Sequence, residues 1–91
     1  IIDLHLSALP TNGNGMSDAE KHQYQLRYFR LQIQQHIHYR GRRITVIHGK
    51  GQGVLKNEIR QILKREYGQQ VEIRDASFAL YEDGATLVVI K

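Results

Sequence analysis

The chain has 91 residues, 41% of them hydrophobic and 24% charged, a composition typical of one small globular domain. It contains no cysteine, which excludes disulfide bonds and thiolate metal sites, and no segment resembles a signal peptide or a membrane span, so we expect a cytoplasmic domain without membrane contact. The net charge of +4 favours polyanionic partners, because a basic surface attracts phosphate groups.

The first half of the chain predicts a strand, a loop and a long helix. Hydrophobic residues alternate over residues 1–6, which predicts a short strand with Asp3 and His5 on one face. The proline- and glycine-containing residues that follow predict a loop. Residues 17–20 have the spacing of a capping box, and apolar residues then recur every three or four positions up to Gly41, so we predict a helix between these points.

The second half predicts a strand over residues 43–48, a glycine-rich turn and an amphipathic helix over residues 55–67. Two further strands, 71–78 and 85–90, flank the turn signal at residues 82–84, which predicts a hairpin. The order is βαβαββ. A strand–helix–strand unit normally pairs its strands in parallel, so the carboxyl ends of the first two strands should meet at one edge of the sheet.

The glycine-rich turn predicts a site for an anion. Gly49, Gly51 and Gly53 stand at alternate positions between a strand and a helix, where backbone N–H groups and the helix dipole favour phosphate. Lys50 adds a charge inside the turn, and the spacing is not that of an ATP-binding P-loop. The alternative interpretation is a tight turn whose glycines only permit close packing.

Asp3, His5 and His48 are the candidate catalytic residues. The topology predicts that Asp3 and His5 reach the same sheet edge as the glycine turn. Asp3 can orient His5 or hold a divalent metal such as Mg²⁺, and either histidine can move a proton. The alternative for Asp3 and His5 is an ordinary surface pair.

Two groups of basic residues are candidate contacts to a nucleic-acid backbone. Arg42 and Arg43 begin the second strand, at the end opposite the glycine turn, and Lys56 and Arg60 start a basic row along the second helix. Contacts of this kind give salt-dependent affinity with little sequence specificity. The alternative for both groups is a solvated, charged surface.

Three motifs, taken together, resemble the Smr (small MutS-related) domain family. They are Ile2-Asp3-Leu4-His5 ahead of a helix, His48-Gly49-Lys50-Gly51-Gln52-Gly53-Val54-Leu55, and Asp83-Gly84-Ala85-Thr86-Leu87-Val88-Val89. The resemblance implies one Smr-like domain over residues 1–91, with the fold of the C-terminal domain of translation initiation factor three: a two-layer α+β sandwich of two helices on a four-stranded mixed sheet. It also implies the C-terminal domain of a longer bacterial protein, which agrees with a first residue that is not methionine.

For function, the resemblance implies binding of DNA or RNA, sometimes on ribosomes, and in several members endonuclease activity. It assigns site residues to two of the motifs: Asp3, His5, His48, Gly49 and Gly51. The family usually has glycine after the first motif's histidine, whereas this chain has Leu6, a departure that bears on cleavage more than on binding. We therefore predict a nucleic-acid-binding domain with endonuclease activity, monomeric by default. The alternative is a non-catalytic module that docks on RNA, a ribosome or a protein.

Overall fold

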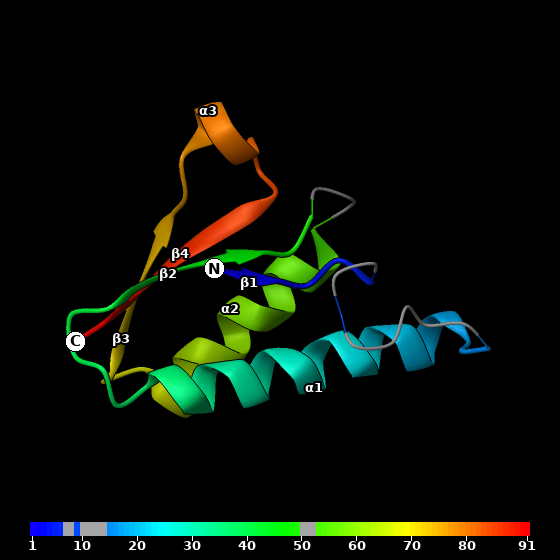
Figure 1. The fold of residues 1–91 in the computed structure, drawn as a ribbon, viewed down its shortest axis with the longest axis horizontal. Coiled ribbons are helices and arrows are strands. Elements are labelled where there is room, and N and C mark those ends of the chain that lie inside the picture. Colours follow the sequence, from blue (N-terminus) through cyan, green and yellow to red (C-terminus); the bar gives the residue numbers. More distant parts are fainter. Residues whose placement is uncertain (7–8, 10–14, 50–52) are drawn as a thin grey trace.

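Four strands and three helices are formed by the residues that the computed structural model describes, which are 1–6, 9, 15–49 and 53–91. In chain order they are β1 (Ile2–Asp3), α1 (Asp18–His36), β2 (Arg43–Ile47), α2 (Val54–Tyr67), β3 (Val71–Asp75), α3 (Phe78–Tyr81) and β4 (Ala85–Ile90). Both long helices lie on the same side of the sheet, and α3 projects away from them (Figure 1). None of the described helices is both long and apolar enough to cross a membrane.

The sheet has the strand order β1-β2-β4-β3. β1 pairs with β2 in parallel, whereas β4 lies between β2 and β3 and is antiparallel to both. β1, β2 and β3 therefore point in the same direction and end at the same edge. The predicted fold class, helices on a four-stranded mixed sheet, is confirmed.

Local sequence signals define helix α1 at its start. Ser17 is the N-cap: its hydroxyl accepts from the Glu20 N–H at 3.2 Å, and the Glu20 carboxylate accepts from the Ser17 N–H at 3.1 Å. This reciprocal pair is the predicted capping box. The helix ends at His36, earlier than predicted, because the chain leaves it through turns; Gly41, with φ of +83°, lies in the link to β2.

A single hydrophobic core joins the sheet to the two long helices. Phe29 and Ile33 of α1 and Ile59 of α2 are completely buried in it. From the sheet, Val46 and Val88 point into the same core, since they alternate with partly exposed neighbours along β2 and β4. This packing fixes the sheet against the helices and so fixes the edge at which the strands end.

Two predicted strands are shorter than expected. β1 ends at Asp3. The last hydrogen bond to β2 runs from Leu4 N to Ile47 O (2.8 Å), and the next N–H, that of His5, donates to the Asp3 side chain instead. β3 stops at Asp75, the last residue with a partner on β4, whereas the predicted strand extended to Phe78, which is instead the first residue of α3. The two strands on either side of α3 pair antiparallel, as predicted.

Candidate functional site

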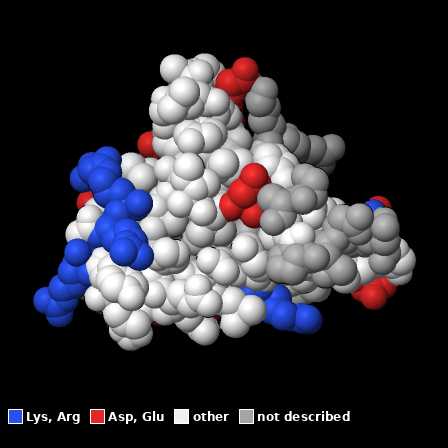
Figure 2. Space-filling model, viewed as in Figure 1, with Lys and Arg blue, Asp and Glu red and all other residues white. Residues whose placement is uncertain are grey.

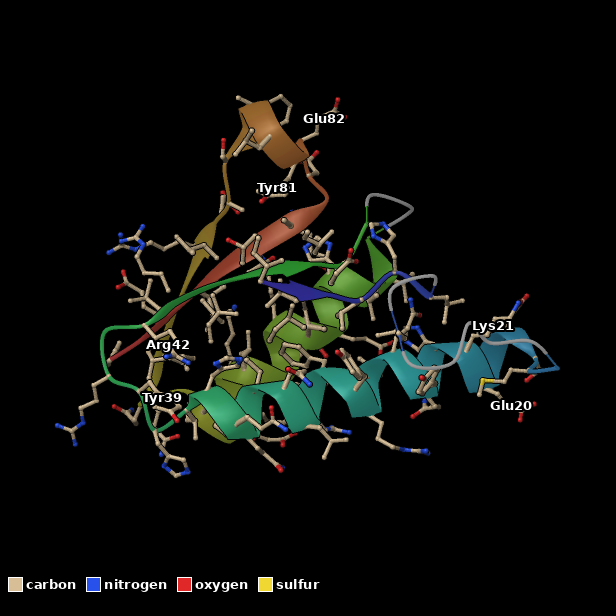
Figure 3. All side chains as sticks on the ribbon, viewed as in Figure 1. Glu20, Lys21, Tyr39, Arg42, Tyr81 and Glu82 are labelled. Carbon is tan, nitrogen blue, oxygen red and sulfur yellow. The ribbon has the colours of Figure 1, made fainter. Side chains whose placement is uncertain are left out.

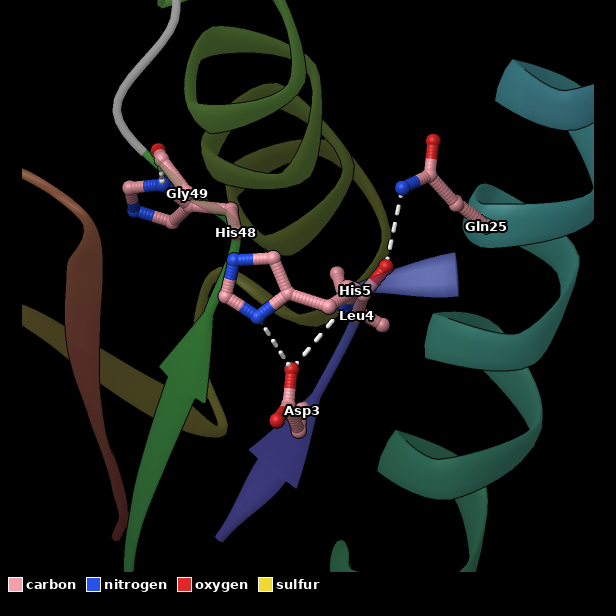
Figure 4. A network of polar contacts seen from close by, with 6 residues as sticks. All are labelled: Asp3, Leu4, His5, Gln25, His48 and Gly49. Atoms are coloured by element: carbon pink, nitrogen blue, oxygen red, sulfur yellow. Dashed lines mark hydrogen bonds and ion pairs between the residues drawn. The ribbon is translucent and has the colours of Figure 1, made fainter. Parts of the chain in front are cut away.

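Asp3 and His5 form a hydrogen-bonded pair immediately after β1. One Asp3 carboxylate oxygen, Oδ1, lies 2.9 Å from the His5 backbone nitrogen and 2.8 Å from Nδ1 of its ring (Figure 4). Because a carboxylate accepts hydrogen bonds, the ring proton is assigned to Nδ1, which leaves Nε2 with a lone pair when the ring is neutral. The His5 side chain is 55% exposed.

The other ring nitrogen of His5 faces the glycine turn. A Cβ atom added to Gly49 would lie 3.5 Å from His5 Nε2, and Figure 4 shows the His5 ring between Asp3 and Gly49. The pairing of Asp3 with Ile47 in the parallel ladder sets this approach. The structure thus brings together the two motifs that chain order predicted to meet at one sheet edge.

Gln25 holds this edge from the helical layer. Its side-chain Nε2 donates to the backbone oxygen of Leu4 at 2.8 Å, between the two residues of the Asp3–His5 pair (Figure 4). The bond fixes the peptide that carries His5 against α1. Sequence reasoning missed Gln25, because one glutamine on an amphipathic helix has no distinguishing local signal.

His48 lies in a different environment from His5. It is only 7% exposed, and both of its ring nitrogens are in hydrogen bonds. Nδ1 donates to the Gly49 oxygen at 2.9 Å, and Nε2 accepts from the Thr86 hydroxyl at 3.0 Å, while that hydroxyl in turn accepts from Arg60 Nε at 3.1 Å. Burial is the main cause that lowers the pKa of His48, and the nearby cations Lys56 and Arg60 lower it further. The ring is therefore neutral near pH 7.

The backbone of the turn is held by the chain that enters β4. The Gly84 oxygen accepts hydrogen bonds from the N–H of His48 at 2.9 Å and of Gly49 at 3.0 Å. The Gly49 N–H thus has a partner within the protein, although the glycine pattern predicted that it would bind phosphate. Sequence reasoning placed Gly84 in a turn signal and both Gly84 and Thr86 in a family motif, but it assigned neither residue to the site. A threonine within the apolar run 85–90 was the available signal.

Among the candidate basic residues, Arg60 is engaged inside the fold. Besides Thr86, it contacts Asp75 through Nη2 at 2.9 Å, and its side chain is 24% exposed. The hydrogen bond from Arg60 lowers the pKa of the Asp75 carboxyl. Lys56, one turn earlier on α2, is half-buried near the same Asp75. Lys50 and Gly51 lie outside the described residues, and the predictions for them stay predictions.

Arg42 and Arg43 lie at the far end of the sheet. Arg43 pairs with Val89, four residues of β2 away from Ile47. Arg42 stacks over the Tyr39 ring at 4.1 Å and donates to His36 Nδ1 at 3.0 Å (Figure 3). Positive side chains gather at this end of the molecule in Figure 2, on the left, where Figure 1 places the start of β2. The structure separates this basic end from the Asp3–His5 edge, as predicted.

No group of three or more metal-ligating side chains occurs within the part of the chain that the structure describes. Asp3 is the carboxylate beside His5, and its Oδ1 already accepts two hydrogen bonds. The predicted role of Mg²⁺ thus rests on a single described carboxylate and stays a prediction.

Comparison with known proteins places the chain in a family. The sequence profile described as "Smr domain" matches residues 15–91, most of the chain. The chain belongs to the Smr domain family. Two curated relatives, both named "Endonuclease MutS2", are similar over 50 residues: 42% identical in Caldicellulosiruptor saccharolyticus and 40% in Caldicellulosiruptor bescii. The matched segment is 55% of this chain but 6% of each relative, and the comparison with solved structures found no match.

Proposed function

We propose that this Smr domain binds nucleic acid and cleaves a phosphodiester bond at the edge where His5 meets Gly49. The carrying observation is the His5 ring, which Asp3 orients so that Nε2 faces the glycine turn. The endonuclease name of the MutS2 relatives and the net charge of +4 support the same substrate class.

In this proposal His5 transfers the proton. Its Nε2 accepts the proton of an attacking hydroxyl or water as that oxygen bonds to phosphorus, and the bond from phosphorus to the leaving oxygen breaks. Asp3 stays ionised, keeps the proton of His5 on Nδ1 and stabilises the imidazolium that forms. The leaving oxygen takes a proton from solvent.

His48 has a positioning role in the same proposal. Its ring nitrogens are bonded to Gly49 and Thr86, so it has no ring nitrogen available for a substrate proton. Through the Gly49 carbonyl it fixes Gly49 beside His5. The sequence-based assignment of proton transfer to either histidine is thus narrowed to His5.

A non-catalytic docking module is the second candidate. Two observations favour it: Leu6 stands where the family usually has glycine, and the Gly49 amide is bonded to Gly84. Both observations concern the groups proposed for cleavage, and neither affects the basic side chains proposed for binding. Ribosome association, a cytoplasmic location and a monomeric state stay predictions in either case.

A cleavage assay tests the proposal. End-labelled single-stranded and duplex RNA and DNA are incubated with the domain, with and without Mg²⁺. We expect cleavage that His5→Ala lowers by about 100-fold or more, the usual size of a general-base contribution, and that Asp3→Asn also lowers. His38→Ala, which changes an exposed histidine outside this edge, is the matched control and keeps wild-type activity.

The binding of the same probes separates the two candidates. If His5→Ala cleaves at the wild-type rate, the assignment of the proton to His5 is wrong. If the wild-type domain binds the probes and cleaves none of them in either buffer, the docking module is the correct function.

A further inference from the structure

Helix α3 presents apolar side chains that the core does not use. Phe78 is 67% exposed and Leu80 is 75% exposed, although each is a large hydrophobic residue. α3 follows the carboxyl end of β3, and β1 and β2 end at the same edge of the sheet. The exposed apolar surface of α3 therefore belongs to the same end of the molecule as His5.

A pocket of about 230 Å³ lies between α3 and this sheet edge. It is lined by His5, Ile47, Gly49, Leu80, Tyr81 and Gly84. Figure 3 shows Tyr81 at the base of α3, where the helix approaches β4. The lining combines two rings, from His5 and Tyr81, with the aliphatic side chains of Ile47 and Leu80. Among the residues that the structure describes, the lining contains no lysine, arginine or carboxylate, and this part of the pocket suits an uncharged, flat group.

The pocket wall is fixed to the glycine turn by backbone hydrogen bonds. The Gly84 N–H donates to the Tyr81 oxygen at 2.8 Å, and the Gly84 oxygen accepts from the N–H of Gly49 at 3.0 Å. Glu82, between them, has φ of +52°, a conformation that non-glycine residues seldom adopt. This chain of contacts holds α3 at a set position above His5.

We propose that this pocket receives one unpaired nucleobase of the bound strand. The inference rests on the proposed function, because His5 and Gly49 line both the pocket and the phosphodiester site. A base stacks on aromatic rings and packs against aliphatic side chains, which are the groups in the lining. The volume is below that of pockets for drug-sized ligands, so it suits one base.

An unpaired base in the pocket implies a preference among nucleic-acid substrates. A base inside a duplex is paired and stacked on both sides, and it enters a side pocket only after it is unstacked, at a cost of a few kcal/mol. A single strand, a loop or a branch point offers unpaired bases without that cost. The domain therefore prefers single-stranded or locally unpaired nucleic acid over a continuous duplex.

Binding of strands that contain 2-aminopurine, a base whose fluorescence reports its stacking, tests the inference. Single-stranded RNA and DNA and their duplexes are titrated with the wild-type domain, with Leu80→Ser and with Leu31→Ser. Leu31, which is 53% exposed on α1, is the matched control. We expect the wild type to prefer single strands and to change the probe fluorescence. Leu80→Ser should weaken single-strand binding about 10-fold, the size expected when a buried aliphatic contact with a base is lost, with an unchanged salt slope. Leu31→Ser should bind as the wild type does.

Each outcome decides a separate claim. If the wild type binds nucleic acid but Leu80→Ser and Leu31→Ser both bind as the wild type does, the pocket takes no base, while the nucleic-acid binding of the proposed function holds. Equal wild-type affinity for single strands and duplexes also overturns the pocket. If the wild type binds none of the probes, the proposed function fails, and the pocket proposal fails with it. Thermal unfolding of both variants verifies that they fold.

Discussion

His5 and His48 show how the surroundings of a residue decide its chemistry. Both stand at the carboxyl ends of neighbouring parallel strands, yet His5 is half-exposed and bonded through one ring nitrogen to Asp3. His48 is buried and bonded through both ring nitrogens. The His5 ring is largely exposed, whereas the His48 ring is bonded to the backbone of Gly49. The same pattern, two like side chains with different roles, recurs in many enzyme sites.

The buried histidine predicts how stability depends on pH. The pKa of His48 is lowered in the folded state, so the unfolded chain binds a proton at a higher pH than the fold does. Protonation therefore favours unfolding: the free energy of unfolding should fall as the pH drops from about 6.5, the ordinary value for histidine, through the lowered pKa. Urea denaturation at pH 7.5, 6.5 and 5.5 measures this slope.

Histidine variants show which residue causes the dependence of the free energy of unfolding on pH. His48→Gln should be less stable at pH 7.5 and should lose less stability on acidification than the wild type. His36 contributes in the same direction, because burial and Arg42 lower its pKa too, so His36→Gln should reduce the slope separately. His38→Gln is the exposed control. A full wild-type slope in His48→Gln would contradict the prediction.

At the scale of elements, Arg60 connects α2 to the sheet. It reaches from the helix to Thr86 on β4 and to Asp75 at the end of β3. Sequence reasoning placed this side chain in a row of nucleic-acid contacts, because a basic residue every four positions looks the same whether it faces solvent or a neighbouring strand. The contact with Thr86 also completes the hydrogen bonds of His48.

Replacement of Arg60 tests which role it has. Arg60→Met should lower the free energy of unfolding by about 1–3 kcal/mol, because the buried Thr86 hydroxyl loses a charged donor. Lys64→Met, one turn further along α2 at an exposed position, should change it by less than about 0.5 kcal/mol. Thermal and urea unfolding measure both variants. If Arg60→Met is as stable as the wild type and binds nucleic acid more weakly, the backbone-contact prediction is the correct one.

The elements that the sequence predicted are those with strong local signals. The capping box at Ser17 and the apolar periodicity of the two long helices depend on residues within a few positions of one another. α3 was not predicted, because four residues are too few to show a period and the preceding residues continue a strand-like pattern. Its position depends on the pairing of β3 with β4, which ends at the pair of Asp75 with Thr86.

The candidate site was predictable in its layout but not in its details. Parallel pairing of β1 with β2 was enough to bring Asp3 and His5 to the glycine turn. The inward direction of the His48 ring could not be predicted, because it depends on Thr86 and Arg60, which are distant in sequence. Such a contact becomes visible only when the strands are assembled.

At the scale of the whole molecule, basic surface and candidate active edge lie at opposite ends of β2. Arg43 and Ile47 are four residues apart, about 13 Å at the usual rise of a strand. A nucleic-acid strand that contacts both of these ends would run along the length of β2. In the proposed function, Arg42 and Arg43 would bind phosphates remote from the proposed cleavage point, where they contribute to affinity and take no part in the chemistry.

Arg43→Ala tests this division of roles. We expect weaker binding to all sequences alike, with the slope of log K against log salt reduced by about one, and an unchanged cleavage rate at saturating substrate. The control is Arg30→Ala, which removes a charge from the helical layer, where it pairs with Glu66 at 3.2 Å. Fluorescence anisotropy at several salt concentrations measures both. An unchanged salt slope in Arg43→Ala would remove this residue from the interface.

The place of β4 in the sheet has a consequence for the newly made chain on the ribosome. β4 is the last strand of the domain, yet it lies between β2 and β3 and carries Thr86, while Gly84 just before it holds the backbone of His48 and Gly49. A nascent chain that ends before residue 84 has β3 without a partner and a glycine turn without its anchor. The candidate site is therefore completed only when β4 has been synthesised, so a chain that ends before residue 84 lacks the contacts that hold His48 and Gly49 beside His5.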